Sequence, residues 1–377
     1  MKCTRKRASW ERQNVCSVSM IYIHVPFCKS FCTYCDFFRE IPQEGAFDTY
    51  TKLVCEEIKS RCKEMDDSLH TLYFGGGTPS VLPLSNLTKI LLALEECGHG
   101  GPYTEFTMEV NPEDIVEKGL PYLQSLRILG CNRISIGIQS LDDDLLRWMN
   151  RRHDAQHAVR AVQMAREAEF ENISVDLIFG LSNLEDKVWE RTIDDTLELN
   201  PEHISCYQLT VEGDSVLAHR LEAGEYEEAS DDQCARQYNL LCHKLHAAGY
   251  NHYEISNFAK PGFEAKHNGG YWQRRPYVGL GPSAHSFSGR GRSWNSNEIS
   301  GYTRTEESLS VEDEIMETLM LSLRTARGAD SEFLEANCSR ENIQRLVGEG
   351  ALVKVGRRYR IPESRFFVSD QIIRDLV

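Results

Sequence analysis

Six short apolar runs recur along the chain, and each is followed by polar or glycine-rich sequence. The runs begin at Met20, Thr71, Glu105, Arg133, Ile173 and His203. Stretches with the spacing of amphipathic helices lie between them, and one of these places Ala158, Val162 and Ala165 on a single face. A strand, a helix and a further strand in repeated order predict a parallel sheet joined by helical crossovers. The chain is therefore expected to be an α/β protein.

Polar or glycine residues stand at or near the carboxyl end of every one of these runs. They are Cys28, Gly75 to Gly77 with Thr78, Glu109, Gln139, Asp176 and Gln208. In an α/β barrel all strand ends converge on one mouth, where active sites lie. In a doubly wound sheet, only the strands beside the switch point meet at one ligand. Six polar strand ends out of six favour a barrel, here a partial (β/α)6 barrel of the TIM type.

The remainder of the chain is divided by changes in composition. We predict a core barrel over residues 20–240 and completion of the barrel over 241–305. Within that second part, residues 255–294 are rich in Gly, aromatic and basic residues and are interpreted as loop and turn. Residues 303–314 are acidic and are interpreted as a solvated boundary that caps the next helix.

The last part of the chain, residues 306–377, is predicted to be a small α+β domain that resembles a winged helix. Its first helix is expected to start near Glu312 and to end with Gly328 as the C-cap. Two short strands joined around Gly356 and a final helix complete it. This domain lacks a strongly basic recognition helix, so we expect a structural or partner-docking role.

The overall composition limits the partners and the location. The 42 basic and 57 acidic residues give a net charge of −15, which argues against nucleic acid as a partner. No run of eighteen apolar residues exists, so no membrane span is expected. The 13 cysteines follow no disulfide rhythm, which indicates reduced thiols and a cytoplasmic protein. Residues 1–19 are basic without an apolar core. We interpret them as a disordered extension or as sequence before a true start at Met20, and a weak targeting signal stays open.

Three cysteines, Cys28, Cys32 and Cys35, lie at C-x3-C-x2-C spacing just after the first apolar run. A structural zinc site closes with four ligands, and His24 is the nearby candidate for a fourth. A [4Fe–4S] cluster held by three thiolates would instead keep one iron free to bind a small molecule with an amine and a carboxylate. The tight loop at a barrel mouth, next to glycines 75–77, favours the cluster.

This motif, with Tyr34 just before its last cysteine, resembles the radical S-adenosylmethionine superfamily. The order of the strand-end motifs is similar to one branch, the oxygen-independent coproporphyrinogen dehydrogenases and their HemW relatives, from about Met20 to the C-terminus. The resemblance implies that S-adenosylmethionine binds the fourth iron. The positions that match the family's cofactor-contacting residues are Tyr22, Tyr34, Gly76, Gly77, Thr78, Glu109, Gln139, Arg151 and Asp176, with Gln208 as a weaker match.

The chemistry of several of these residues agrees with that implication. Glycines let the backbone approach a ligand closely. Glu109 is suited to a ribose hydroxyl or the cationic amine, and Asp176 to a ribose hydroxyl. Arg151 is suited to a carboxylate, and its neighbour Arg152 is a rival from sequence alone.

Two features distinguish the branches. The dehydrogenases resemble C-x3-C-x2-C-x-C, whereas Phe37 stands at the last of those positions here. They also carry a longer N-terminal extension. The stretch "HNGGYW", His267 to Trp272, looks like the H-N-x-x-Y-W motif of the HemW heme chaperones. His267 is an axial ligand candidate, Tyr271 a weaker ligand or a stacking partner, and Trp272 a stacking partner. Arg274 and Arg275 are candidates for the propionates.

We therefore predict a heme chaperone that binds one heme, carries a [4Fe–4S] cluster with exchangeable S-adenosylmethionine, and passes heme to an unidentified acceptor protein. The alternative is a radical enzyme of heme biosynthesis that decarboxylates coproporphyrinogen III, and a radical enzyme for an unrelated substrate is a third reading. Whether the chain is an enzyme stays open from sequence, as does a homodimer.

Overall fold

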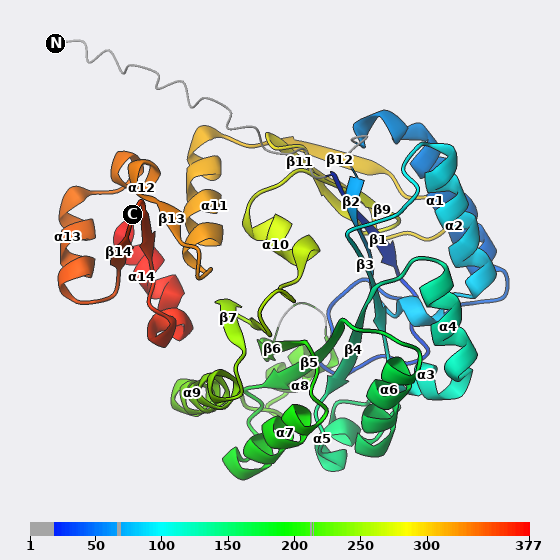
Figure 1. Cartoon of the computed structure of the whole chain (residues 1–377), viewed down its shortest axis with the longest axis horizontal. Helices are drawn as coiled ribbons and strands as arrows, with labels where there is room; N and C mark the ends of the chain where they lie inside the picture. The colour runs from blue at the N-terminus through cyan, green and yellow to red at the C-terminus, as the bar shows by residue number, and fades with distance from the viewer. Residues whose placement is uncertain (1–18, 66–68, 212, 214) are drawn as a thin grey trace.

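The computed structural model describes residues 19–65, 69–211, 213 and 215–377. All six predicted strands are present, and neighbours in sequence pair in parallel, so the predicted barrel order is confirmed. They are β1 (Ser19–Val25), β2 (Leu69–Gly76), β3 (Glu105–Val110), β4 (Arg133–Gln139), β5 (Ile173–Phe179) and β6 (His203–Gln208). The sheet curves round on itself without closing (Figure 1). The six strand ends therefore face one mouth.

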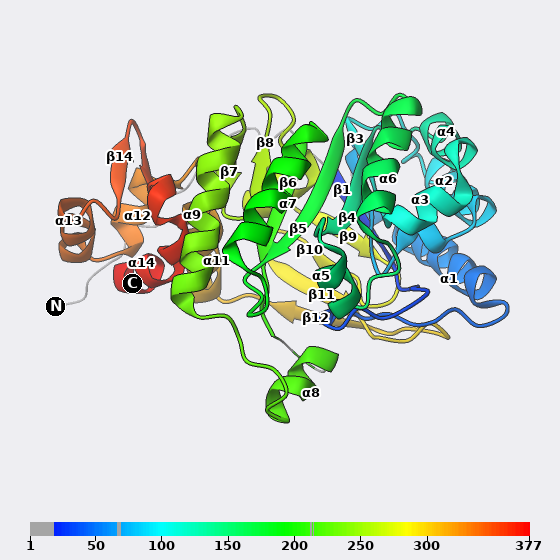
Figure 2. The ribbon, with the colours of Figure 1, turned by 90° about the horizontal axis from the view of Figure 1, so that it is seen from below.

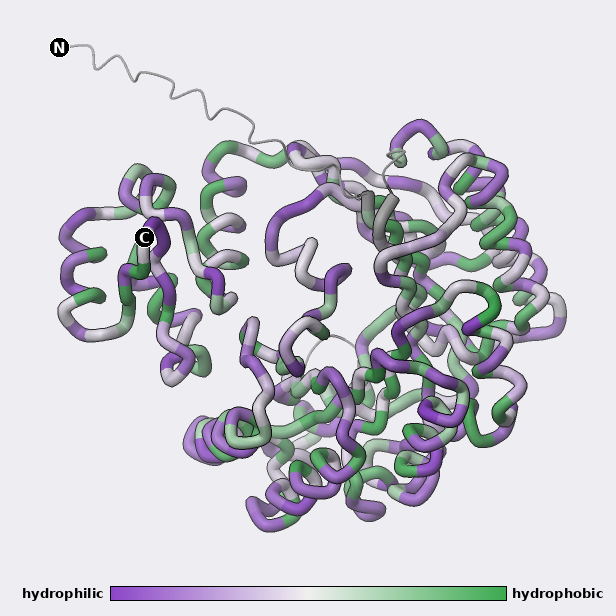
Figure 3. The backbone as a smooth tube through the Cα atoms, viewed as in Figure 1, coloured by the Kyte–Doolittle hydropathy of each residue, from purple (hydrophilic) through white to green (hydrophobic). Residues whose placement is uncertain are grey.

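Helices cover the outer side of the curved sheet (Figure 1). They are α1 (Ala46–Ser60), α2 (Leu84–Glu96), α3 (Pro112–Lys118), α4 (Leu120–Ile128), α5 (Asp143–Trp148), α6 (Ala155–Glu167), α7 (Asp186–Glu198) and α9 (Asp231–Ala247), with short 3₁₀ turns at Cys62–Glu64 and Pro79–Val81. Helix α6 buries Ala158, Val162 and Ala165, as its spacing predicts. Hydrophilic and hydrophobic positions alternate along these helices (Figure 3), because one side of each packs on the strands.

One further helix, α8 (Val216–Glu222), projects away from the rest of the barrel (Figure 2). Its first turn is nevertheless anchored. The amide of Leu217 donates to the carbonyl of Thr33 over 3.0 Å or less, at 2.9 Å, and the Leu217 side chain is fully buried. Thr33 belongs to the loop that carries the three cysteines, so α8 holds this loop from outside.

The prediction that residues 255–294 are loop and turn is wrong. The segment contains β8 (Asn257–Ala259), α10 (Lys266–Trp272), β9 (Tyr277–Leu280), β10 (His285–Phe287) and β11 (Gly291–Asn295). Together with β7 (Asn251–Glu254) and β12 (Arg304–Ser308) they extend the sheet to the order β12-β11-β10-β9-β1-β2-β3-β4-β5-β6-β8-β7. These strands have three to five residues each. Runs so short carry little periodic signal, and pairing with neighbours forms them, as when β9 pairs in parallel with β1.

The acidic stretch behaves partly as expected. Every residue of β12 is exposed, and Ser310 with Asp313 forms a capping box at the start of α11 (Val311–Leu323). The predicted C-cap is wrong, because α11 ends at Leu323 and Arg324 is its C-cap. Gly328 has φ +72° for another reason, since a Cβ there would collide with the Tyr359 carbonyl oxygen.

The C-terminal part is the α+β module that was predicted. It contains β13 (Ala329–Asp330), α12 (Ser331–Asn337), α13 (Arg340–Gly348), β14 (Val353–Val355), β15 (Arg358–Arg360), a 3₁₀ turn (Glu363–Val368) and α14 (Ser369–Leu376). Its strands form an antiparallel sheet in the order β13-β15-β14, with the β14–β15 turn at Gly356. The boundaries drawn at residues 240 and 305 stay a prediction.

Backbone hydrogen bonds join this module to the barrel. The amide of Ile255 donates to the Arg324 carbonyl at 3.0 Å, and the amide of Ala326 donates to the Tyr253 carbonyl at 3.0 Å. A β-bridge between Glu254 and Thr325 lies between these two bonds. We refer to these contacts as the β7 seam.

Two sequence interpretations concern the ends and the surface. The interpretation of residues 1–19 as an extension or as sequence before the start lies outside the described residues, Ser19 excepted. Among the residues that were described, no helix is long and apolar enough to cross a membrane.

Candidate functional site

A cavity of about 550 Å³ opens inside the barrel at the carboxyl ends of the strands. Its lining brings together nearly all of the residues singled out from sequence. They are Tyr22, Cys28, Cys32, Tyr34, Cys35, Gly76, Gly77, Thr78, Glu109, Gln139, Arg151, Asp176, Gln208, His267 and Tyr271. Trp272 does not line this cavity and lies instead on a second one. The strand-end rule therefore located one contiguous site.

The loop with the three cysteines follows β1 and is fixed at both sides. The Cys28 amide donates to the Glu40 carbonyl at 3.0 Å, and the Glu40 amide donates to the Pro26 carbonyl at 2.7 Å. The Cys28 thiol lies 3.3 Å from the Thr78 hydroxyl. Burial raises the pKa of the Cys28 thiol to about 11 and also raises that of Cys35. A cation bound in the cavity would offset this cost, because metal binding deprotonates thiols.

The donor set fits an iron–sulfur cluster better than a zinc ion. Within the described residues, no three His, Cys, Asp or Glu side chains are arranged to hold a single metal ion. In a [4Fe–4S] cluster each thiolate binds a different iron, which places the thiolates farther apart than on one ion. His24, the candidate fourth zinc ligand, is engaged elsewhere: its Nδ1 lies 3.1 Å from the Tyr22 hydroxyl and its Nε2 lies 3.1 Å from the Phe38 carbonyl. Burial also lowers the pKa of His24 to about 4.

The three glycines at the end of β2 are explained by close packing. A Cβ on Gly76, which has φ +109°, would come within 2.6 Å of the His24 ring. A Cβ on Gly77 would come within 2.9 Å of the Phe27 carbonyl oxygen. The amides of these glycines already have partners, since Gly76 donates to Glu109 Oε2 at 3.2 Å and Gly77 donates to the Val25 carbonyl at 2.8 Å. The glycines thus let the strand end pass directly against the cysteine loop.

Glu109 is the carboxyl group with the most altered acidity in the middle of the cavity. Its Oε1 accepts from the Tyr73 hydroxyl at 2.6 Å. Burial raises the pKa of Glu109 to about 7, and the nearby Asp176 carboxylate adds to the shift. The Asp176 carboxylate accepts from the Ser135 hydroxyl at 3.2 Å, and burial raises its pKa too. Two buried carboxyl groups facing one cavity suit the binding of ribose hydroxyls and an ammonium group.

Glu109→Gln is expected to remove one pH dependence of stability. Between pH 4.5 and about 7 the folded chain holds a proton on Glu109 that the unfolded chain has lost, so the free energy of unfolding falls as pH rises through this window. One proton corresponds to a fall of about 1.4 kcal/mol per pH unit. Urea unfolding at several pH values should show a smaller fall in the variant. Glu167→Gln, at an exposed Glu paired with Arg160, should keep the parent's fall; an unchanged fall in Glu109→Gln would assign it to another group.

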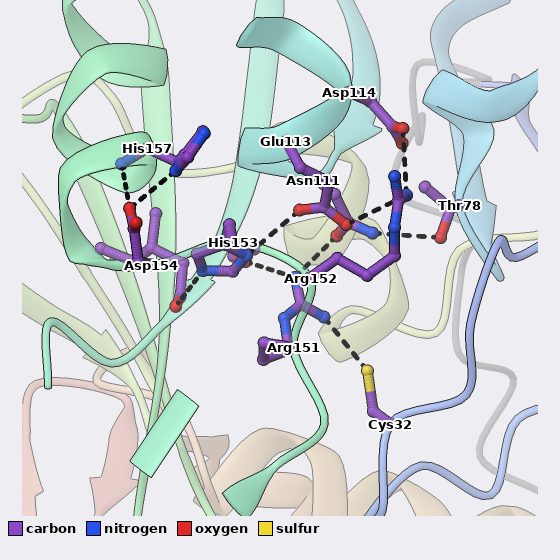
Figure 4. Close-up of polar contacts among 12 residues, drawn as sticks. Cys32, Thr78, Asn111, Glu113, Asp114, Arg151, Arg152, His153, Asp154 and His157 are labelled. Carbon is purple, nitrogen blue, oxygen red and sulfur yellow. Dashed lines mark hydrogen bonds and ion pairs between the residues drawn. The ribbon is translucent and has the colours of Figure 1, made fainter. Parts of the chain in front are cut away.

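The structure distinguishes Arg151 from Arg152 (Figure 4). Arg151 Nη1 donates to the Cys32 sulfur at 3.3 Å, and its Nη2 donates to Asn111 Oδ1 and to the Gly137 carbonyl, each at 2.8 Å. Arg152 turns to α3 and pairs with acidic residues there; its partners, at 3.5 to 3.8 Å, are Glu113, Asp114 and Glu117. Only Arg151 therefore reaches the cysteine loop, and Arg152 is occupied by surface carboxylates.

Three residues of the cavity were missed by the sequence reasoning. Asn111 donates to the Thr78 hydroxyl at 3.3 Å and accepts from Arg151, so it links two strand ends. Tyr73 holds Glu109. Arg133 is 3% exposed and lines the floor of the cavity. The position of Asn111 directly after β3 was a usable signal, whereas Tyr73 and Arg133 lie within or at the start of strands.

The segment "HNGGYW" forms helix α10, which lies within the curve of the sheet (Figure 1). His267 is buried, and both of its ring nitrogens are engaged: Nδ1 lies 2.9 Å from the Thr71 hydroxyl and Nε2 lies 2.8 Å from the Tyr271 hydroxyl. Burial, with a further contribution from the positive Arg133, lowers the pKa of His267 to about 3. Arg274 is paired with Glu317 at 3.0 Å, and Arg275 donates to Gln273 at 2.9 Å. His267 thus anchors α10 to the barrel in this structure.

Comparison with known proteins agrees with this site. A sequence profile of the Radical SAM superfamily matches residues 22–196, the part of the chain that contains the cysteine loop and β1 to β5. A solved structure of coproporphyrinogen III oxidase (HemN) from Escherichia coli superposes with a TM-score of 0.79 at 21% identity, over 95% of this chain and 90% of that one. The chain therefore has the fold of a radical S-adenosylmethionine protein.

Sequence relatives specify the branch. The heme chaperone HemW of Bacillus subtilis is 35% identical over 81% of this chain and 83% of its own length. The zebrafish (Danio rerio) mitochondrial radical S-adenosyl methionine domain-containing protein 1 is 31% identical over 92% of this chain and 82% of its own length. The chain belongs to the HemW family.

Proposed function

We propose that this protein is a heme chaperone that binds one heme and transfers it to an acceptor protein. The supporting observation is the identity of 35% to the Bacillus subtilis protein, whose name is that of a heme chaperone. A local feature points the same way. Phe37, two residues after Cys35, lines the mouth of the cavity with an exposed fraction of 63% and supplies no thiol there.

In this proposal Cys28, Cys32 and Cys35 hold a [4Fe–4S] cluster, and S-adenosylmethionine exchanges at its free iron. The cluster and S-adenosylmethionine, when bound, supply one-electron chemistry. The chain's own groups position the cofactor: Arg151 lies against the cysteine loop, and Glu109 and Asp176 face the centre of the cavity. The neighbouring contacts expected from the family resemblance are Tyr22, Tyr34, Gly76, Gly77, Thr78, Gln139 and Gln208, all of which line the cavity.

Heme is proposed to bind at α10, through His267, Tyr271 and Trp272. Iron ligation by His267 Nε2 requires its contact with the Tyr271 hydroxyl to open, since that nitrogen has no second acceptor or donor site. The acceptor protein, a cytoplasmic location and a homodimer remain predictions. The rival function is oxidative decarboxylation of coproporphyrinogen III on the same cavity.

A paired experiment separates chaperone from enzyme. The reconstituted protein is titrated with hemin without oxygen, and a parallel sample receives S-adenosylmethionine, a reductant and coproporphyrinogen III. The chaperone predicts a saturable one-to-one shift of the Soret band and no protoporphyrinogen or 5′-deoxyadenosine formed in step. Product formation with both species would establish the enzyme, and the absence of saturable hemin binding would refute the chaperone.

A further inference from the structure

A second cavity, of about 510 Å³, lies on the other side of α10 from the first. It is bounded by β7, α10, α11 and the C-terminal module, and the β7 seam forms part of its wall. Helix α10 separates the two cavities: His267 and Tyr271 line the first, whereas Gly269 and Trp272 line the second. The heme residues expected from sequence are thereby divided between two spaces.

Arginine side chains from three elements converge on this second cavity. Arg274 follows α10, Arg327 follows α11 and Arg358 belongs to β15. Arg274 is paired with Glu317. Among the residues that the structure describes, neither Arg327 nor Arg358 has an ion pair, and Arg358 Nη1 donates only to the Gly328 carbonyl, at 2.9 Å. Burial and the neighbouring charge of Arg327 lower the pKa of Arg358, so these two cations repel each other.

The carboxylates that line the same cavity are already bound by other groups. Glu254 is fully buried and accepts from the Ser256 amide at 3.0 Å and from the Asn257 side chain. Asp330 caps α12 by accepting from the Glu332 and Phe333 amides at 3.0 and 3.2 Å. Neither carboxylate forms an ion pair with Arg327 or Arg358 within the described part of the chain. Two guanidinium groups are left to face an anionic ligand.

The rest of the lining is suited to a flat, largely apolar ligand. Trp272, Phe333 and Tyr253 contribute aromatic surface. The buried indole Nε1 of Trp272 lacks a hydrogen-bond partner among the described residues. The volume lies in the range of pockets that bind small molecules. Aromatic walls beside two unpaired guanidinium groups match a tetrapyrrole that carries propionates better than they match a small inorganic anion.

We propose that the second cavity binds the propionate edge of heme, with Arg327 and Arg358 as the carboxylate ligands and Trp272 against the macrocycle. The inference rests on the proposed function, since it assigns where the heme carboxylates bind. It also differs from the sequence-based assignment of the propionates to Arg274 and Arg275, because Arg274 is held by Glu317 and Arg275 is not part of this lining.

The test compares hemin with its dimethyl ester, whose propionates carry no charge, delivered in the same detergent to the full-length protein. Arg327→Gln/Arg358→Gln should bind hemin at least about tenfold more weakly than the parent, because charge-assisted hydrogen bonds are lost. Its affinity for the ester should equal the parent's. Arg357→Gln is the matched control, since Arg357 is exposed, adjacent in sequence and outside the cavity lining.

A second readout reports the location of the ligand. Hemin should quench the tryptophan fluorescence of the parent protein more than that of Trp272→Phe. If the double variant unfolds, Arg327→Gln alone serves, because the exposed Arg327 forms no ion pair within the described chain. Equal hemin affinity in parent and Arg327→Gln, or equal parent affinity for hemin and ester, would overturn the inference while leaving the chaperone intact. No saturable hemin binding by the parent would refute the proposed function itself.

Discussion

A Cys32→Ala variant, reconstituted without oxygen, is expected to hold no stable [4Fe–4S] cluster. The loop supplies three thiols to one cavity, and Cys32 is the one that Arg151 contacts at 3.3 Å. Removing it leaves two protein ligands for a cluster that is held by at least three. Iron and acid-labile sulfide should fall close to background, and the visible absorbance of the cluster should disappear.

The matched control is Cys55→Ala. Cys55 is half-buried on α1, where its thiol donates to the Lys89 carbonyl at 3.6 Å, and it lies outside the cavity lining. This variant should incorporate as much iron and sulfide as the parent protein. Both variants should unfold at temperatures close to that of the parent apoprotein. Full iron and sulfide in Cys32→Ala would remove this residue from the ligand set, and equal loss in both variants would indicate a general failure of reconstitution.

His267→Ala is expected to lower the free energy of unfolding by about 2–5 kcal/mol, because it creates a cavity and leaves two hydroxyl groups without partners. Those hydroxyls belong to Thr71 and Tyr271, at 2.9 and 2.8 Å from the ring nitrogens. Urea unfolding at pH 7.5 measures the change. His157→Ala, at an exposed histidine on α6, should cost less than about 1 kcal/mol. A loss as small for His267→Ala would contradict the anchoring role.

Tyr271→Phe separates anchoring from iron ligation at the same helix. This change frees His267 Nε2 while the Thr71 contact remains. If that nitrogen is the axial ligand, Tyr271→Phe should bind hemin more tightly than the parent, whereas His267→Ala should bind it more weakly. Weaker binding in both variants would assign the ligand role to Tyr271 or to the pair. Unchanged binding in both would exclude this pair from iron ligation.

The strand ends were predictable because each joins a buried apolar run to a polar residue. Glu109 and Gln139 stand out for that reason, and both line the cavity. Gln139 has a further property that sequence does not reveal, since its φ of +62° lies in the left-handed region. Arg133 escaped notice because it begins β4, and the strand-end rule takes no account of a long side chain that reaches inward from the opposite end.

The burial of His267 could not be read from sequence for a different reason. A histidine in a glycine-rich stretch has the composition of an exposed turn, yet here the glycines allow a helix to pack inside a barrel. A Cβ at Gly270 would overlap the sulfur of Met20, so α10 approaches β1 as closely as a glycine permits. Only the meeting of segments 250 residues apart reveals this, just as β9 forms by pairing with β1.

The β7 seam bears on how the chain can be shortened in the laboratory. Tyr253 and Ile255 use backbone groups on the C-terminal module, so a fragment that stops near residue 305 would present β7 as an unsatisfied sheet edge. Open edges of this kind recruit strands from other molecules. Such a fragment should precipitate or self-associate even though all six barrel strands are intact, and crystallisation or display formats that separate the two parts would need a substitute strand along β7.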